Sequence, residues 1–442
     1  MSDSMDYQAR ATGIIDLCRK LYPVRGLIVS PDLDRAFGQI AQALPGMKIH
    51  EYPSGMQSED WVVPPSWQAV AGRLEDRSGR VLASLEQSFL FAAPYSEPVD
   101  GWFSKTEIAK HLRTRPEVPD AYVLEHRHAY DYRLKDWGIT LPHAVWQAMP
   151  EKADYRVLIQ TEVRPGKLKV AEMVLEGRRP ETICICSQFD ELCNDGQSSA
   201  VLGMDLMRRL MKREKREFTY QLLLVPEMFG TLFFVLNNRE RVRRTAGMLN
   251  LETIGAGEKW LHKASLPGDS LVDHALRLAF AETGIACEET GFFGGYGNDE
   301  RVYAWPTIGI PGVALQRFPF RFYHTNRDTP DILEPALVVE ALKIADQFID
   351  ILERDYVPQY RNKAQPWLTR HGLYFDHYQD PQKFQRLNNT VLFNVDGRRP
   401  VSELARLAGV RFGELHDYLE RFAALGLIGK SPLKVELPAT AF

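Results

Sequence analysis

Alternating strand and helix patterns between residues 180 and 355 constrain the fold more than any other feature of this sequence. Four short apolar runs are typical of buried strands: 181–187, 220–227, 247–255 and 307–315. Three longer segments have the apolar spacing of amphipathic helices: 198–214, 270–283 and 334–355. This alternation predicts an α/β fold with a largely parallel or mixed sheet covered by helices on both faces. Because ligands of such sheets bind at the carboxyl ends of the strands, we expect the chemistry there.

Composition narrows the class of protein. The 442 residues are enough for two to four domains, and 45% hydrophobic with 25% charged residues is ordinary for a globular protein. A net charge of −4 does not favour nucleic acid or an anionic membrane as the main partner. The acidic first residues lack the apolar run of a signal peptide, and no stretch approaches a membrane span. The five cysteines form no CxxC pair, so we expect buried reduced thiols in a cytoplasmic protein.

The first half of the chain predicts two helices over residues 1–45 and then a β-rich unit. Short alternating strands separated by turn signals run through 49–175, with one helix near 104–113. We therefore assign 1–48 and 176–358 to the α/β core, and 49–175 to an inserted β-rich domain.

The C-terminal part predicts a linker over 358–385 and a small winged-helix module over 385–442. We expect a short strand before Asp396, a first helix capped by Ser402, a second helix from Glu414, and a wing from 425–430 and 434–437. Eight basic residues against six acidic ones give the module little net charge. We therefore expect packing or dimerisation by this module, not sequence-specific DNA binding.

Several polar side chains follow the predicted core strands. A carboxylate at the buried end of a strand costs several kcal/mol unless it is paired or bound to a metal. Each residue alone has a simple structural explanation, such as an N-cap for Asp195 or packing for His324. Together they suit a cation bound by carboxylates and one imidazole, with a further carboxylate to deprotonate water. The candidates are Gln188, Asp190, Asp195, Glu227, Glu252 and His324.

A glycine-rich segment at 291–312 is not a dinucleotide-binding motif, since no strand precedes it at the required spacing. It is either a substrate-facing loop or a purely structural one. Its polar residues are Asp299, Glu300 and Arg301.

Six sequence motifs together resemble a bacterial aminopeptidase-like family of unknown function within the di-zinc aminopeptidase superfamily. They are EYPSG with DWVVP, SEPVDGWFS, KDWGITL, VPEMFG, GNDERVYAWPTIGIP and FYHTNRDTPDILEP. The resemblance covers nearly the whole chain. It implies a zinc-exopeptidase-like mixed-sheet core, an inserted protease-associated-type β domain and a C-terminal winged helix.

The resemblance also implies roles for individual residues. Asp195 matches the bridging aspartate of the superfamily, and Glu252 stands where the superfamily has another aspartate ligand. His324 matches the final histidine ligand, and Glu227 matches the general base. We therefore expect Asp195, Glu252 and His324 to lie around one ion, with Glu227 beside it.

Two departures put the usual pair of ions in doubt. Gln188 stands where the superfamily has its first histidine, and Met228 replaces the second glutamate of the Glu-Glu pair. The His of the family's Cys-His-Pro motif is also missing, since the chain has Leu192 there. Three ligands and water can hold a catalytic zinc, with Gln188 as a weak fourth. Because of these changes, we expect a site that holds one zinc ion or no metal at all.

Three functions remain open from the sequence. The first is a metallopeptidase that hydrolyses an amide at a free amino end, acting on a small peptide or amino-acid-like substrate. In it Asp299 and Glu300 would grip the ammonium, and Asp190, Arg301 and Tyr323 would contact substrate. The second is a pseudoenzyme that binds such a ligand without hydrolysis. The third is a regulatory or scaffold protein acting through the winged helix; a homo-oligomer is compatible with all three.

Overall fold

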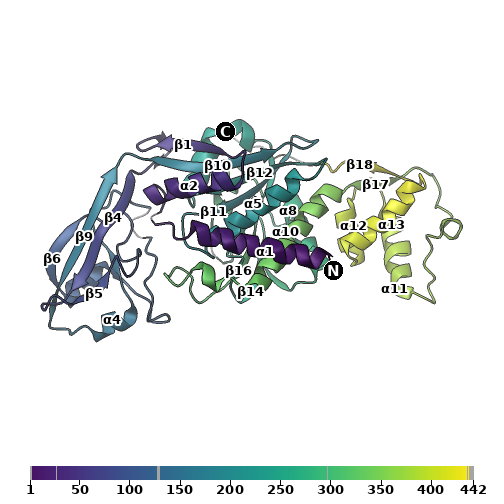
Figure 1. Ribbon diagram of the computed structural model, residues 1–442. Coiled ribbons are helices and arrows are strands. Elements are labelled where there is room, and N and C mark those ends of the chain that lie inside the picture. Colours follow the sequence, from purple (N-terminus) through teal and green to yellow (C-terminus); the bar gives the residue numbers. More distant parts are fainter. Residues whose placement is uncertain (1, 26, 127–129, 296, 436, 438–442) are drawn as a thin grey trace.

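An eight-stranded mixed sheet forms the core of the protein (Figure 1). The computed structural model describes residues 2–25, 27–126, 130–295, 297–435 and 437. The strand order is β1-β10-β12-β11-β13-β16-β14-β15. Strands β12, β11, β13 and β16 are parallel to one another. β10 is antiparallel to both β1 and β12, and β14 is antiparallel to β16 but parallel to the edge strand β15. The bounds are β1 Lys48–Pro53, β10 Lys167–Leu175, β11 Thr182–Gln188, β12 Thr219–Val225, β13 Thr245–Glu252, β14 Lys259–Lys263, β15 Cys287–Thr290 and β16 Gly312–Phe318. The predicted α/β core with a mixed sheet is confirmed.

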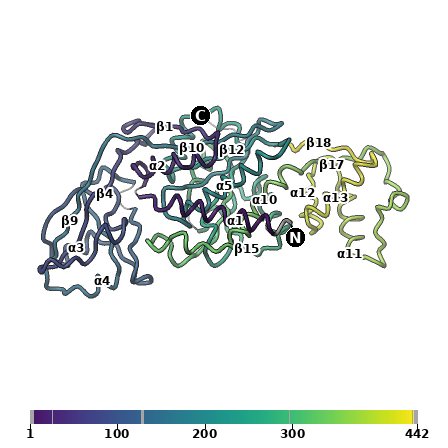
Figure 2. The backbone as a smooth tube through the Cα atoms, in the orientation of Figure 1, coloured from purple at the N-terminus to yellow at the C-terminus, as the bar shows by residue number. Residues whose placement is uncertain are grey.

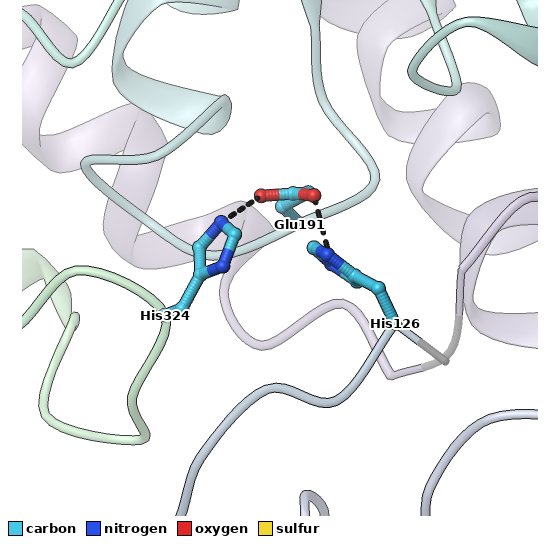
Figure 3. A group of neighbouring side chains, drawn as sticks. All are labelled: His126, Glu191 and His324. Carbon is cyan, nitrogen blue, oxygen red and sulfur yellow. Dashed lines mark ion pairs between the residues drawn. The ribbon is translucent and has the colours of Figure 1, made fainter. Parts of the chain in front are cut away.

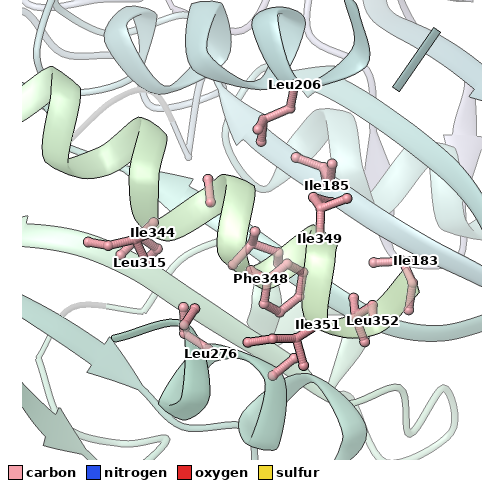
Figure 4. Close-up of a cluster of buried hydrophobic side chains, with 14 of the residues drawn as sticks. Ile183, Ile185, Leu206, Leu276, Leu315, Ile344, Phe348, Ile349, Ile351 and Leu352 are labelled. Atoms are coloured by element: carbon pink, nitrogen blue, oxygen red, sulfur yellow. The ribbon is translucent and has the colours of Figure 1, made fainter. Parts of the chain in front are cut away.

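Alternation along the strands divides the buried side chains between two hydrophobic cores. In β11, Ile183 and Ile185 belong to one core, while Cys184 and Cys186 belong to the other. Successive strand residues point to opposite faces, so one strand serves both cores. Figure 4 shows Ile183 and Ile185 among side chains of the first core, including Phe348.

Helices cover both faces of the sheet. The first core packs under α1 Ser2–Leu21, α2 Pro31–Ala43, α5 Gln197–Met211, α8 Leu271–Thr283 and α10 Pro335–Arg354. The second core packs under α6 Phe229–Asn237 and α9 Glu300–Tyr303. Shorter elements connect them: α7 Arg239–Val242 and η1 Pro330–Ile332. None of the described helices combines the length and apolar character needed to cross a membrane.

The inserted unit is built on a four-stranded antiparallel sheet with the order β5-β4-β9-β6. It lies at one end of the main sheet, on the left of Figure 1. Its elements are β2 Gln57–Ser58, β3 Trp61–Val62, β4 Ser66–Glu75, β5 Val81–Ser84, β6 Val99–Ser104, α3 Lys105–His111, β7 Leu112–Arg113, β8 Ile139–Thr140, α4 His143–Ala148 and β9 Asp154–Arg164. In α3 a capping box between Ser104 and Glu107 fixes the start of the helix.

The edges of the insertion differ from the sequence assignment. Strands β1 and β10, which lie inside 49–175 apart from Lys48, pair with each other and join the main sheet through β12. The backbone therefore returns to the core along β10, directly after β9 (Figure 2). An alternating pattern predicts a strand but not the sheet that it joins, so this domain boundary could not be located from the sequence alone.

The C-terminal module contains two helices at the expected places, α12 Val401–Ala408 and α13 Phe412–Ala424. Three predictions about it are wrong. The segment before Asp396 is helical, with α11 Pro381–Lys383, a π-helical stretch Phe384–Val391 and a 3₁₀ turn Leu392–Asn394. Ser402 lies inside α12, which begins after Pro400. Strand β18 Ile428–Ser431 pairs with β17 Val357–Tyr360, at the start of the predicted linker, which also contains the 3₁₀ turn Leu368–His371.

The remainder of the predicted wing lies partly outside the described residues, which omit 436 and 438–442. Residues 434, 435 and 437 form no strand. Four of the five cysteines are buried and free, as expected, but Cys287 is exposed on the edge strand β15.

Candidate active site

A cavity of about 220 Å³ opens at the carboxyl ends of the central strands. Gln188 ends β11, Glu252 ends β13, Glu227 follows β12 by two residues, and His324 lies in the loop after β16. All of them line the cavity together with Asp195. The strand-end argument therefore placed these five residues in one pocket, although their roles stay predictions.

Two histidines and two carboxylates converge on one side of this pocket. Glu191 lies between the two imidazoles (Figure 3): its Oε1 is 3.1 Å from Nε2 of His126, and its Oε2 is 3.2 Å from Nε2 of His324. Oδ2 of Asp195 is 2.9 Å from the same His324 nitrogen. One ligand atom from each of His126, Glu191 and His324 lies within 4.8 Å of the others.

The polar atoms of this cluster suit a bound cation. Nε2 of His126, Oε2 of Glu191 and Oδ2 of Asp195 are buried, and each lies 2.9–3.2 Å from a polar atom of another member of the cluster. Buried polar groups need such partners, and a metal ion bound at the centre of the cluster would supply them equally well. Two ligand atoms on one tetrahedral zinc ion lie about 3.4 Å apart, given bonds of about 2.1 Å. The observed separations of 2.9–3.2 Å come close to this value, and imidazole with carboxylate is a common zinc donor set.

The charges of the cluster are strongly coupled. Burial opposes ionisation of Glu191, yet His126 and His324 hold the pKa of its carboxyl well below its usual range. Burial and the Glu191 carboxylate raise the pKa of Asp195 to about 7. Burial alone would lower the pKa of His324, but the Glu191 and Asp195 carboxylates raise it to about 10. The carboxylates and imidazoles of the cluster therefore share protons, and these protons occupy the positions that a metal ion would take.

The inserted unit brings His126 to the core through backbone contacts. The N–H of Leu124 donates to the carbonyl of His324 over 2.9 Å, and Val123 forms an antiparallel bridge with Thr325. These contacts carry the chain to His126, whose ring lies 4.7 Å from that of His324, nearly perpendicular to it. A residue of the inserted unit thus completes a cluster whose other members belong to the core.

Glu227 is held by carboxylates that contact its backbone. The N–H of Glu227 donates to Asp190 over 2.9 Å, and the N–H of Met228 donates to Asp299 over 3.0 Å. Burial, followed by the surrounding carboxylates, raises the pKa of the Glu227 side chain well above its usual range. The hydroxyl of Tyr130, from the inserted unit, donates to Oε2 of Glu227 over 3.2 Å. A carboxyl group with this environment is suited to exchange protons.

The other half of the pocket is occupied by amides. The side-chain amide of Gln188 donates to Oδ1 of Asp195 over 3.3 Å, and that of Asn298 donates to Oε1 of Gln188. Oε1 of Glu252 accepts from the Asn250 amide over 2.6 Å. Burial and then the Glu300 carboxylate raise the pKa of Glu252 well above its usual range. This half has fewer charged donors than the half with His126 and His324.

The expected substrate-binding residues are placed differently from one another. Tyr323 lines the pocket and stacks on His324 with ring centroids 3.8 Å apart. Asp190, Asp299 and Glu300 do not line it and have partners inside the protein. The carboxylate of Glu300 pairs with Lys263 over 2.6 Å, with both side chains buried. The positions of Asp190, Asp299 and Glu300 therefore do not support the substrate-binding role predicted for them.

Arg301 lies at the side of the pocket instead of facing into it. The residue is exposed, and its guanidinium lies over Gly297, which does line the pocket. A Cβ on Gly297 would come within 1.6 Å of Nε of Arg301, so only glycine permits this arrangement.

Four site residues were missed from the sequence. Glu191 directly follows Asp190 at the end of β11, so the strand-end argument could have included it. Asp328 accepts the backbone N–H groups of Asn194 and Asp195, over 2.7 and 3.0 Å, and fixes the Asp195 loop. His126 and Tyr130 lie on a loop of the inserted unit, where no strand end or motif marks them.

Comparisons with known proteins agree with this architecture. The model of the family described as "Domain of unknown function (DUF4910)" matches residues 15–355. A curated protein of Clostridium acetobutylicum, provisionally named as a polysaccharide biosynthesis protein with an aminopeptidase-like domain, is 23% identical over 433 residues. The match covers 94% of this chain and 96% of that protein.

Solved structures share the fold at low sequence identity. A Clostridium acetobutylicum protein provisionally named as a peptidase has a TM-score of 0.83 and 21% identity, covering 96% of this chain and 98% of its own. The zinc aminopeptidase BSAP of Bacillus subtilis has a TM-score of 0.57 and 13% identity, covering 77% and 94%. An aminopeptidase of Aneurinibacillus sp. strain AM-1 has a TM-score of 0.51 and 14% identity, covering 78% and 93%. The expected zinc-exopeptidase-like fold and the resemblance to an aminopeptidase-like family are confirmed.

Proposed function

The chain belongs to the family described as Domain of unknown function (DUF4910), and we propose that it is a metal-dependent, aminopeptidase-like hydrolase that cleaves an amide next to a free amino end. The observation that carries this proposal is the convergence of His126, Glu191, Asp195 and His324 beside Glu227. These residues would hold one zinc ion. The amides of Gln188 and Asn298, in the other half of the pocket, favour one ion over two.

A zinc ion held there would polarise the substrate carbonyl and lower the pKa of water. Glu227 would take the proton of the attacking water and deliver it to the leaving amine. The hydroxyl of Tyr130 would orient the Glu227 carboxylate through the contact at 3.2 Å. Asp190 and Asp299 keep this turn in place through the backbone N–H groups of Glu227 and Met228.

The shape and charge of the pocket support a substrate with a free amino end. A cavity of about 220 Å³ has room for about one amino-acid residue. Its lining includes the carboxylates of Glu191, Asp195, Glu227 and Glu252. Once the first three contact the ion or the reacting water, Glu252, which the resemblance assigned to the ion, remains. A bound ammonium group would favour its ionised form, against the burial that raises its pKa. This assignment replaces Asp299 and Glu300, which have partners elsewhere.

The test combines metal analysis with hydrolysis. We expect about one zinc per chain in protein purified without chelators, and cleavage of aminoacyl-nitroanilides that stops after chelation. An N-acetylated substrate should not be cleaved, since it lacks the ammonium. Glu227→Gln should retain the metal and lose activity. Protein that binds no metal after supplementation and cleaves none of these substrates would contradict the proposal.

A second function is favoured by Gln188 and Met228, which stand where the superfamily has metal ligands. In that case the pocket would bind an amino-acid-like or peptide-like ligand without hydrolysis. Calorimetric binding of such a ligand to metal-free protein, with no product formed, would support this alternative.

A further inference from the structure

An apolar groove lies beside the pocket, and we call it the α6 groove. Its volume is about 710 Å³. One side is the exposed face of α6 with Met228 before it, and the others come from Trp61 and from residues 302–308 after the start of α9. The indole of Trp305 lines the groove with 63% of the residue exposed. Exposed large apolar side chains grouped in one depression mark a binding site more often than a random surface.

The groove borders the pocket at consecutive residues of the chain. Glu227 lines the pocket, and the next residue, Met228, lines the groove. A row of aromatic rings follows the same border: Tyr130, which contacts Glu227, packs on Phe229 with centroids 5.8 Å apart. Phe229 in turn contacts Trp61 of the groove edge to face, at 4.9 Å. The rings of Tyr130, Phe229 and Trp61 therefore form the border between the pocket and the groove, with Phe229 buried between the other two.

The side chain of Arg301 lies where the pocket and the groove meet. Arg301 lines the groove, and its guanidinium covers Gly297 of the pocket. Among the described residues no carboxylate lies within ion-pair distance of this guanidinium. The other arginine of the groove, Arg239, already has Glu59 at 3.7 Å. Arg301 is therefore the cation available to an anionic group at the junction, and a guanidinium binds carboxylates in a bidentate manner.

We propose that the α6 groove binds the second residue of a short peptide, with an apolar side chain against Trp61 and Trp305 and a carboxylate at Arg301. This inference rests on the proposed function, because the first residue, with its free amino group, then fills the pocket. The scissile amide lies at Glu227, on the border of the two cavities. The smallest substrate that satisfies every contact is a dipeptide with an apolar second residue and a free carboxyl group.

The experiment compares Ala-Phe with Ala-Ala and with Ala-Phe amide. We expect kcat/KM for Ala-Phe to exceed that for each of the others by on the order of 10-fold or more. Trp305→Ala should abolish the preference over Ala-Ala, and Arg301→Gln should abolish the preference over the amide. Both residues are exposed, so neither change removes core packing. Trp367→Ala is the matched control, since Trp367 is 67% exposed on the C-terminal side of the chain and does not line the groove.

Binding to Glu227→Gln, measured by isothermal titration calorimetry, separates the groove from the hydrolase. If these dipeptides are bound with the expected order of affinity but the wild type cleaves neither them nor aminoacyl-nitroanilides, the groove stands and the proposed hydrolysis fails. If they are cleaved without preference, or the preferences survive both substitutions, the groove assignment is overturned and the hydrolase stands. If they are neither bound nor cleaved while aminoacyl-nitroanilides are cleaved, the groove assignment is overturned and the hydrolase stands. If the nitroanilides are not cleaved either, both proposals are overturned.

Discussion

Removing the imidazole of His126 is the most direct test of the cluster that the inserted unit completes. Nε2 of His126 is buried and lies 3.1 Å from Oε1 of Glu191. Loss of a group that only supports a metal ligand weakens metal binding by about 10–100-fold. Loss of a ligand itself should reach at least the upper end, so we expect His126→Ala to weaken zinc binding by about 100-fold or more.

The loss of zinc affinity can be measured as a loss in the free energy of unfolding. At a free zinc concentration of about 100 times the wild-type Kd, zinc stabilises the wild type by about 2.7 kcal/mol. With a 100-fold weaker site, the same concentration stabilises the variant by only about 0.4 kcal/mol. The assay is denaturant unfolding at fixed free zinc, together with competition against a chromophoric chelator for the Kd itself.

His111→Ala provides the matched control. His111 lies in the same inserted unit and is 24% exposed, close to the 25% of His126, but it pairs with Asp136 and does not line the pocket. We expect this variant to bind zinc as the wild type does. Equal zinc affinity in wild type and His126→Ala would refute the reasoning, and so would an equal loss in His111→Ala.

Three further substitutions test other parts of the structure. Glu227→Gln should reduce hydrolysis by about 10²–10⁴-fold in a nitroanilide assay while zinc content stays unchanged. Phe348→Ala, in the fully buried first core, should lower the free energy of unfolding by about 3–5 kcal/mol in urea. Burial raises the pKa of Asp355 from 3.8 to about 6, so its carboxyl favours folding only while protonated, and this contribution is lost as the pH rises through 6. Asp355→Asn should therefore match the wild type near pH 4 and exceed its stability by roughly 2–3 kcal/mol at pH 8. A variant stabilised equally at both pH values would contradict this account.

Most of the core, but only part of the candidate site, could be predicted from the sequence. Apolar runs with polar ends located the strands, and parallel strands bring their carboxyl ends to one edge, which placed Glu227 and Glu252 together. That rule says nothing about loops from another unit, and so it missed His126. Nor does it give side-chain direction after a strand: Glu300 begins the short helix α9 and turns inward to Lys263.

The same limit explains the C-terminal errors. Helices α12 and α13 have local apolar spacing, which the sequence displays directly. The partner of β18 is set by tertiary packing, because β17 belongs to a segment that reads as a linker. Local pattern cannot identify a pairing between strands so far apart in the chain.

The pairing of β17 with β18 fastens the C-terminal module at both of its ends. β17 precedes the module and β18 follows α13, so one two-stranded sheet holds both ends of the module. A chain cut before Ile428 would leave β17 with a bare edge of N–H and C=O groups, ready to recruit a strand from a neighbour. Because β18 is the last strand of the described chain, it is also the element that two copies could exchange at least cost. Truncation at this end should therefore promote self-association through β17.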